Sequence, residues 1–296
     1  MHAVDPESIV VAGGRLRYRV ALDRVIPVLL LVAFAVILFP LGDMIYWISA
    51  KALPTFSLAT ITEPQVGLGG GLNQMVVGTL VIIAISTAIA SVVGILAGMY
   101  TAEYAPRRVA ELGRLAGYLL SGVPAVVLGF FGLLLLCTYA GWGYSLGAGA
   151  VTLAIFMVPF IYRTSDLAFS SVPREHREGA LAMGATRGQY LRRVALPIAL
   201  PAMLTGIFLA MAIGLGETAP LLFTMGEVNA LPTGFFSPTA FLSGSIWQFY
   251  DAPTTEGTLH TLAFQAAFLL LVMVIGLNVV IQVIAEHYRR RLRGLF

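Results

Sequence analysis

The chain has 296 residues, of which 58% are hydrophobic and only 11% are charged. An ordinary soluble domain carries about 25% charged residues, so this composition excludes a soluble globular enzyme, a disordered chain and a secreted disulfide scaffold. The single cysteine, Cys137, cannot form an internal disulfide, and no cluster of cysteine and histidine residues indicates a metal site.

Long segments without Asp, Glu, Lys or Arg indicate where the chain crosses a membrane. They cover residues 25–42, 64–102, 115–162, 194–216 and 257–285. A membrane-spanning helix needs about 20 mostly apolar residues, so the third segment is long enough for two helices joined by a glycine-rich turn at 140–149. Only helices or closed barrels satisfy their backbone polar groups in lipid, and continuous apolar runs favour helices.

The sequence therefore predicts an all-α integral membrane protein with six transmembrane helices. Their expected ranges are 25–50, 73–100, 115–139, 147–163, 198–223 and 259–285. The uncharged segment 228–250 is a rival span, but its proline, glycine, asparagine and serine content favours an external loop with a short helix. Gly94 and Gly98 lie four residues apart, a spacing that is typical of close helix packing in membranes.

The arginines predict the orientation of the chain through the positive-inside rule. A cytoplasmic N-terminus places 17 of the 18 basic residues inside and leaves only Lys51 outside. This predicts a cytoplasmic N-terminal segment at 1–24, a transmembrane domain at 25–285 and a cytoplasmic arginine-rich tail at 286–296. Because the arginines are spread over four segments, the basic pI near 9.1 does not indicate a nucleic-acid partner.

The longest internal segment between spans, 164–196, is expected to hold two short helices. Pro173 suits the first turn of a helix, Gly184 can end that helix in a left-handed conformation, and Thr186 with Gln189 has capping-box spacing. By these signals alone the segment could be a plain helical hairpin at the membrane interface.

The same segment also contains a known motif. Its residues are Glu178-Gly179-Ala180, then Gly184 after three residues, then Val194-Ala195-Leu196-Pro197 after nine more. This pattern resembles the EAA motif of ABC-importer permeases, with glycine and valine in place of one alanine and the isoleucine. The resemblance implies a coupling helix that docks in a groove of a cytoplasmic ATPase. Its docking residues would be Arg177, Glu178, Gly179, Ala180 and Gly184.

Further motifs over roughly residues 40–285 are similar to those of phosphate-importer permeases of the PstA type. They are Gly69-Gly70-Gly71, Ala102-Glu103-Tyr104-Ala105-Pro106, Arg163-Thr164-Ser165-Asp166 and Gly216-Glu217-Thr218-Ala219-Pro220-Leu221. The resemblance implies a type I, MetI-like permease in a bacterial plasma membrane, with the importer core at about 73–285. Since the chain has no Walker sequence, it would be a transport subunit without cofactors of its own, and ATP and Mg²⁺ would bind the partner ATPase.

The resemblance also implies a set of partners. They are a second, PstC-like permease subunit, two PstB-like ATPase subunits, an extracytoplasmic PstS-like phosphate-binding protein and membrane lipid. A permease for another oxyanion, molybdate or sulfate, is the alternative within the same class. An intramembrane enzyme would need a nucleophile–base or metal constellation that the sequence lacks, and a channel would not explain the EAA motif.

Three residues are candidates for the substrate pathway: Arg163, Glu217 and Thr218. Arg163 can offer a planar fork of donors to phosphate oxygens, or it could be an ordinary cytoplasmic flanking residue. Glu217 is an intramembrane carboxylate, which by default indicates function; if ionised, it can accept a hydrogen bond from the proton that phosphate carries and repel sulfate. A structural carboxylate is the alternative. PstA-type chains usually have an arginine four residues earlier, where this chain has Ile213, so a basic partner for Glu217 would come from the second permease.

Overall fold

The computed structural model describes residues 6–67, 69–252 and 257–293. Residues 1–5 of the expected N-terminal cytoplasmic segment and residues 294–296 of the expected C-terminal tail lie outside the described residues. The chain divides into two compact units, with the boundary between Lys51 and Ala52. The first unit is the helix α1 (Pro6–Ala52), which continues through Pro27 and Pro40. Its apolar side chains from Val25 to Met44 are exposed, as expected for a helix whose solvent is lipid.

The second unit is a helical bundle built around α3 (Asn73–Glu103) and α6 (Leu146–Ser170). These helices run in the same direction, because Gly94 lies against Ile161, and Gly98, four residues later, lies against Ser165 and Asp166, four and five residues after Ile161. A Cβ atom at Gly98 would lie 2.7 Å from the backbone nitrogen of Asp166, closer than real Cβ contacts. The prediction that the two glycines mark helix packing is therefore confirmed.

The prediction of one continuous helix at 115–139 for the third span is wrong. The structure has α4 (Arg107–Ser121), then α5 (Ala125–Gly132) continuing into the π-helical η2 (Leu133–Tyr139). The two halves are bent by 93° at a break over residues 122–124. Pro124 explains the break, since its nitrogen cannot donate a helical hydrogen bond and its ring restricts the residue before it.

The glycine-rich turn after this span is shorter than predicted. Gly141 and Gly143 have positive φ angles of 72° and 61° and form the turn. Gly147 and Gly149, however, already belong to α6. The helix begins early because Ser145 is its N-cap and accepts a hydrogen bond from the backbone nitrogen of Ala148 at 3.3 Å.

The fifth predicted span is also interrupted. One helical run comprises α8 (Arg187–Tyr190), the π-helical η3 (Leu191–Ala195) and α9 (Leu196–Gly216), and α10 (Ala219–Met225) follows separately. Glu217 is extended, with ψ at 128°. A continuous helix would need a hydrogen bond from residue 220 to the carbonyl of Gly216, and Pro220 has no N–H to donate.

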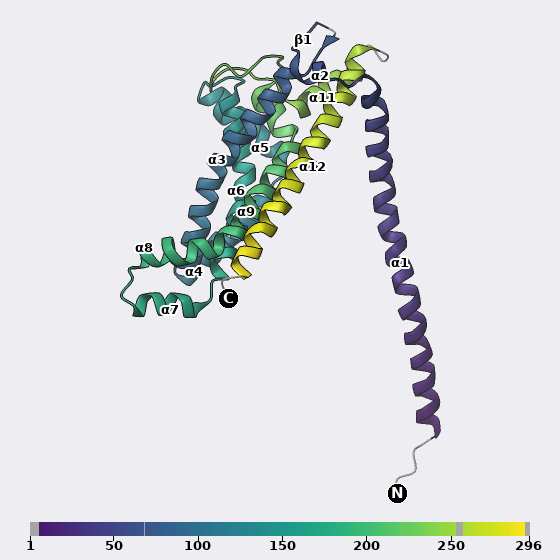
Figure 1. Ribbon diagram of the computed structural model, residues 1–296, viewed down its shortest axis with the longest axis vertical. Coiled ribbons are helices and arrows are strands. Elements are labelled where there is room, and N and C mark those ends of the chain that lie inside the picture. Colours follow the sequence, from purple (N-terminus) through teal and green to yellow (C-terminus); the bar gives the residue numbers. More distant parts are fainter. Residues whose placement is uncertain (1–5, 68, 253–256, 294–296) are drawn as a thin grey trace. The chain divides into compact units, whose positions relative to one another are not determined.

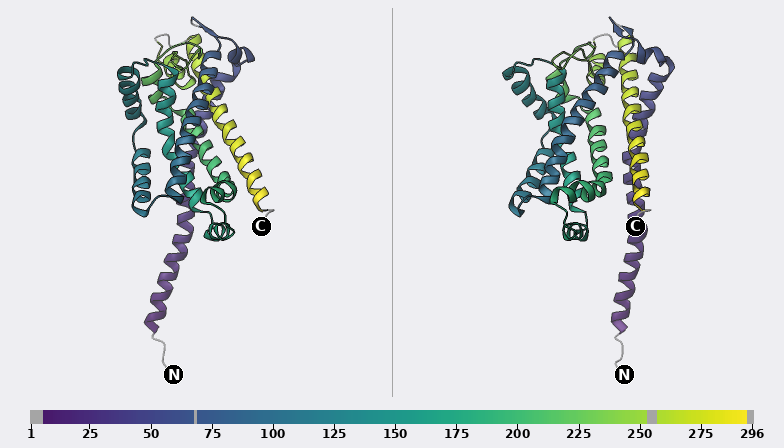
Figure 2. Two further views of the ribbon diagram at one scale, coloured as in Figure 1. Left: turned by 90° about the vertical axis from the view of Figure 1, so that its left-hand side faces the viewer. Right: turned by 60° about the vertical axis from the view of Figure 1, so that its left-hand side comes forward.

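The remaining elements lie at the two ends of the bundle and along its side (Figures 1 and 2). One end carries η1 (Leu53–Thr55), α2 (Leu58–Thr62), the hairpin of β1 (Gln65–Val66) and β2 (Gly69–Gly70), and α11 (Leu242–Tyr250). The other end carries α7 (Arg174–Ala182) and α8. The last helix is α12 (Thr258–Arg293), which packs against α9 and α11. The short helix expected inside 228–250 is confirmed as α11.

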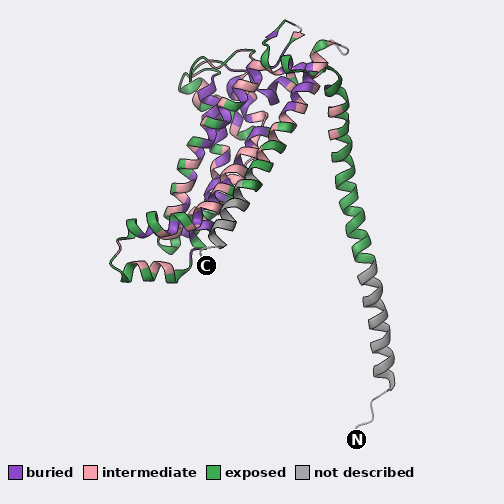
Figure 3. Ribbon diagram, in the orientation of Figure 1, coloured by how far each residue is buried: buried purple, intermediate pink, exposed green. Residues whose placement is uncertain are grey.

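Within the described residues, five helices are long and apolar enough to cross a membrane, or six if the bent pair α4 and α5–η2 forms one span. The buried core of the second unit lies between α3, α6, α9 and α10, around Ile82, Leu153 and Met157. Figure 3 shows this core as the buried centre of the bundle, whereas α7 at its end is exposed or half-buried. The bundle thus holds two features in fixed relation: a packed interior and a projecting helical hairpin.

Candidate functional site

The projecting hairpin forms as the sequence predicted, with small shifts. Pro173 is the N-cap of α7, and Gly184 has a φ angle of 83°, the left-handed conformation expected of it. Thr186 and Gln189 form a capping box, in which the Thr186 N–H donates to Gln189 Oε1 at 2.8 Å and the Gln189 N–H donates to Thr186 Oγ1 at 3.3 Å. These local hydrogen bonds fix the turn between α7 and α8.

The outer side of α7 is open. Glu178 and Gly179 are exposed, and a Cβ atom at Gly179 would meet nothing within 4 Å. Met183, just past the end of the helix, is 89% exposed. A bulky apolar side chain beside a glycine gap and a carboxylate is a surface suited to close approach by a partner, because the gap admits another backbone and the methionine can repack.

The two other residues predicted on this helix lie differently. Ala180 is half-buried and packs against the cluster around Phe169 and Tyr190. Arg177 lies with its Nη1 3.6 Å from Oε2 of Glu103, the last residue of α3. The predicted docking residues are therefore brought together on one helix and turn, but Arg177 contacts the bundle itself.

Arg163 lines a pocket of about 590 Å³ between α4, α6 and α9. Its guanidinium carbon lies 4.4 Å from the ring centroid of Tyr118, a cation–π contact that favours one orientation of the charged group. The polar residues that line this pocket are Arg114, Tyr118, Tyr162, Arg163, Thr164, Asp166 and Ser170. We name it the Arg163 pocket.

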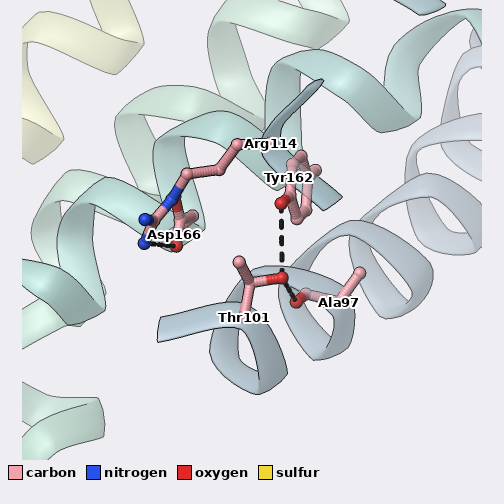
Figure 4. A network of polar contacts seen from close by, with 5 residues as sticks. All are labelled: Ala97, Thr101, Arg114, Tyr162 and Asp166. Carbon is pink, nitrogen blue, oxygen red and sulfur yellow. Dashed lines mark hydrogen bonds and ion pairs between the residues drawn. The ribbon is translucent and has the colours of Figure 1, made fainter. Parts of the chain in front are cut away.

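A second arginine enters the pocket from α4. Arg114 donates from Nε to Asp166 Oδ2 at 2.8 Å and from Nη2 to Asp166 Oδ1 at 3.1 Å, a fork-shaped pair. The Asp166 side chain is 13% exposed and that of Arg114 is 44% exposed, so the arginine keeps contact with the pocket opening. Figure 4 shows the pair beside Tyr162. Sequence reasoning missed Arg114 because its partner lies 52 residues away and nothing local marks it.

Tyr162 holds this part of α6 in place. Its hydroxyl hydrogen-bonds to Thr101 Oγ1 on α3 at 3.2 Å, and Thr101 Oγ1 in turn donates to the carbonyl of Ala97 at 2.9 Å (Figure 4). Its ring fills the space left by Gly117 on α4, where a Cβ atom would lie 2.7 Å from Tyr162 Cε1. Because Arg163 follows Tyr162 directly, contacts with both α3 and α4 position the start of the pocket.

Glu217 and Thr218 lie elsewhere, at the break between α9 and α10. The Ser243 hydroxyl donates to the backbone carbonyl of Glu217 at 2.8 Å, and Thr218 is the N-cap of α10. The Glu217 side chain is half-buried and forms no ion pair with any residue whose side chain the structure describes. Ile213 lies one turn earlier on α9 and offers no charge.

The structure does not bring Glu217 and Arg163 together. Gly206 of α9 packs directly against Thr164, so it marks the depth of the Arg163 pocket along that helix. Glu217 follows Gly206 by 11 residues, and at about 1.5 Å of rise per residue this places it roughly 16 Å away along the axis. The two candidate pathway groups therefore lie at different depths of the bundle.

Comparisons with known proteins agree with this architecture. Residues 94–294 match the family described as binding-protein-dependent transport system inner membrane component. The phosphate transport system permease protein PstA 2 of Mycobacterium tuberculosis is 36% identical over 87% of this chain and 85% of its own length. PstA of Haemophilus influenzae is 32% identical over 84% of this chain and 89% of its own length.

A solved structure shows the same fold. The inward-facing MetNI methionine ABC transporter, at 21% sequence identity, matches 73% of this chain and 95% of its own chain with a TM-score of 0.62. The matched family covers more than half of the sequence, and the MetNI structure agrees with the helical bundle described above. The chain is therefore a multi-pass membrane protein that belongs to the family of binding-protein-dependent transport system inner membrane components.

Proposed function

We propose that the chain is the permease subunit of an ATP-driven importer for inorganic phosphate. The observation that carries the substrate is the Arg163 pocket, with its two arginines and one carboxylate. Phosphate near neutral pH carries negative charge and also a proton, so it needs donors and an acceptor together. Arg163 supplies donors, and Asp166, already compensated by Arg114, supplies an acceptor. The names of the PstA relatives support the same substrate.

The net charge of the pocket supports selectivity among oxyanions. Arg114, Arg163 and Asp166 together carry one net positive charge, which favours an anion without holding it too tightly for release. Sulfate has no proton to donate to Asp166, so its negatively charged oxygens would face a carboxylate oxygen with no hydrogen between them. Glu217 would act at a second point of the route, where a basic group of the partner permease would complement it.

The α7–α8 end of the bundle would face the cytoplasm in a bacterial plasma membrane. The 17-to-1 distribution of basic residues supports this orientation. In this orientation, residues 1–24, the loop 164–196 and the tail 286–296 would lie inside. Glu178, Gly179 and Met183 would then dock with an ATPase subunit, which binds the ATP and Mg²⁺. The full assembly would contain a PstC-like permease, two PstB-like ATPases and a PstS-like binding protein.

Transport would follow from alternating access. Closure of the ATPase pair would move α7, open the bundle toward the binding protein and admit phosphate; hydrolysis would return it to a state in which the Arg163 pocket opens to the cytoplasm. This is a rigid-body transition of packed helices rather than chemistry on the substrate. The chain would accordingly act as a transport subunit and not as an enzyme.

The test is uptake of radiolabelled phosphate by the complete complex in proteoliposomes, with sulfate and molybdate as competitors. We expect Arg163→Gln to lower phosphate uptake at low concentration by about tenfold or more, as the loss of one charge-assisted contact of about 1.5–3 kcal/mol implies. Arg108→Gln is the matched control, because Arg108 is an exposed arginine of α4 outside the pocket.

Two results would count against the proposal. Competition by sulfate or molybdate equal to that by unlabelled phosphate would show an importer of a different oxyanion. Equal uptake by the Arg163→Gln and Arg108→Gln variants would remove the Arg163 pocket from the transport route.

A further inference from the structure

The transport route proposed above gives no role to Glu103, the last residue of α3. Its side chain is 9% exposed, and a carboxylate so far removed from water needs compensating partners. One of its oxygens, Oε2, lies 3.6 Å from Nη1 of Arg177, and the other, Oε1, accepts a hydrogen bond from the Tyr190 hydroxyl at 3.3 Å. Glu103 therefore contacts both helices of the projecting hairpin, α7 through Arg177 and α8 through Tyr190.

The two contacts differ in how firmly the bundle holds the partner. Tyr190 is 3% exposed and packs in a cluster with Phe169 and Met203. By contrast, α7 contains no buried residue, so burial of apolar surface contributes little to holding it in place. The Arg177–Glu103 ion pair is partly desolvated, which strengthens it relative to an exposed pair. It is thus a polar attachment of α7 to a transmembrane helix.

From Glu103 the contacts continue to the Arg163 pocket. Thr101, two residues earlier on α3, hydrogen-bonds to Tyr162 (Figure 4), and Gly98 lies directly against the backbone of Asp166, so α3 and α6 are closely packed here. Arg163 follows Tyr162 in the sequence. A displacement of the end of α3 would therefore be transmitted to the segment of α6 that bears Arg163 and Asp166.

We propose that Glu103 is a positioning residue that attaches the coupling helix α7 to α3 and so transmits movement of the ATPase to the Arg163 pocket. The proposal rests on the function proposed above and specifies its mechanical connection. Glu103 touches neither substrate nor ATP. Its loss should leave the ATPase able to hydrolyse ATP while less of that hydrolysis drives transport.

The experiment compares Glu103→Gln, Arg177→Gln and their combination in the complete reconstituted complex. Two quantities are measured: oxyanion uptake per ATP hydrolysed, and hydrogen exchange of the backbone amides of α7. We expect each single variant to lower the oxyanion uptake per ATP hydrolysed by about fivefold. We expect hydrogen exchange in α7 to be faster by about the same factor, within the range for residues in a coupling network. The double variant should add little, because both changes remove the same contact.

Glu111→Gln is the matched control. It makes the same chemical change on α4, where Glu111 pairs with Arg107 in a solvent-exposed i,i+4 arrangement, and both quantities should stay at the wild-type value. If Glu103→Gln fails to assemble, Arg177→Gln carries the test alone, since it removes the same ion pair from the side of α7; the same direction of change is expected.

Unchanged exchange in α7 or an unchanged uptake ratio in Glu103→Gln overturns the proposal, as does an equal effect of Glu111→Gln. Both quantities are ratios to the wild type, and hydrogen exchange needs no substrate. A wild-type preference for sulfate or molybdate would therefore contradict the phosphate assignment while leaving this test intact.

Discussion

At the scale of single residues, glycines allow the close helix contacts of the bundle, and arginines set the charge of the Arg163 pocket. Gly98 and Gly117 create space that neighbouring helices fill, one with a backbone and the other with the ring of Tyr162. Arg114 and Arg163 place positive charge in the pocket and are held there by Asp166 and Tyr118 respectively. Both kinds of contact depend on atoms far apart in the sequence, so the same residue types at other positions would have different effects.

Replacement of Gly98 tests the close packing of α3 on α6. A valine there would place its Cβ 2.7 Å from the backbone nitrogen of Asp166, and overpacking of this kind costs typically about 1–3 kcal/mol or more. We expect Gly98→Val to lower the thermal unfolding midpoint of the purified complex in detergent. Gly276→Val on α12 is the control, because a Cβ atom at Gly276 meets nothing within 4 Å. An unfolding midpoint equal to that of the control would contradict the packing described for α3 and α6.

At the scale of elements, the sequence predicted where apolar helices lie but not where they bend. Charge-free runs locate α3, α6 and α12 because length and hydropathy alone decide whether a segment can span lipid. The breaks before Pro124 and at Glu217 leave hydropathy unchanged, since they arise from a missing backbone donor rather than from polarity. The prolines were visible, but helices such as α1 continue through proline, so the residue type by itself did not distinguish a break from a tolerated proline.

The same limit applies to the site. The EAA-like spacing located α7, because the motif is local and its turn is fixed by Gly184 and the capping box of Thr186. The Arg114–Asp166 pair and the Arg177–Glu103 pair connect different helices. Sequence spacing carries no information about such pairs until the packing of the helices is known.

Addition of a side chain at Gly179 tests α7 as a docking element. Because a Cβ atom there meets nothing in the permease within 4 Å, Gly179→Leu should leave the fold and its thermal stability unchanged. On the docked surface the new side chain would clash with the ATPase, and we expect binding weaker by about tenfold, or roughly 1.4 kcal/mol. The measurement is the dissociation constant of purified ATPase subunits from the permease pair in nanodiscs.

The matched control for this element is Gly188→Leu. Gly188 lies on α8, is exposed and is equally open around its Cα atom, so it reports the effect of an added leucine near the hairpin but off α7. Unaltered ATPase binding by Gly179→Leu would show that another surface docks with the ATPase. Equal weakening by both variants would show that the hairpin as a whole, rather than α7, forms the contact.

At the scale of the whole molecule, the second unit has two dissimilar ends joined by the long helices α3, α6 and α9. One end carries the α7–α8 hairpin with its exposed arginines, and the other carries a short β-hairpin, α11 and a group of aromatic rings at Trp142, Phe235 and Phe236. Aromatic rings are enriched at membrane interfaces and arginines on the cytoplasmic side. Since aromatic rings occur at both interfaces, it is the arginines of the α7–α8 end that predict the orientation, with that end on the cytoplasmic side.

Labelling of single cysteines tests that orientation. In a Cys137→Ser background, Phe236→Cys should react with a membrane-impermeant maleimide in intact cells, because Phe236 is 60% exposed at the aromatic end. Met183→Cys, at a position 89% exposed beside α7, should react only after the membrane is permeabilised. Met183→Cys removes an exposed side chain, and Phe236→Cys removes ring contacts with Trp142 and Phe235 that lie at the surface, so the difference in labelling reports the side of the membrane. Labelling of position 183 in intact cells would show the opposite orientation, in which no cytoplasmic ATPase could reach the hairpin.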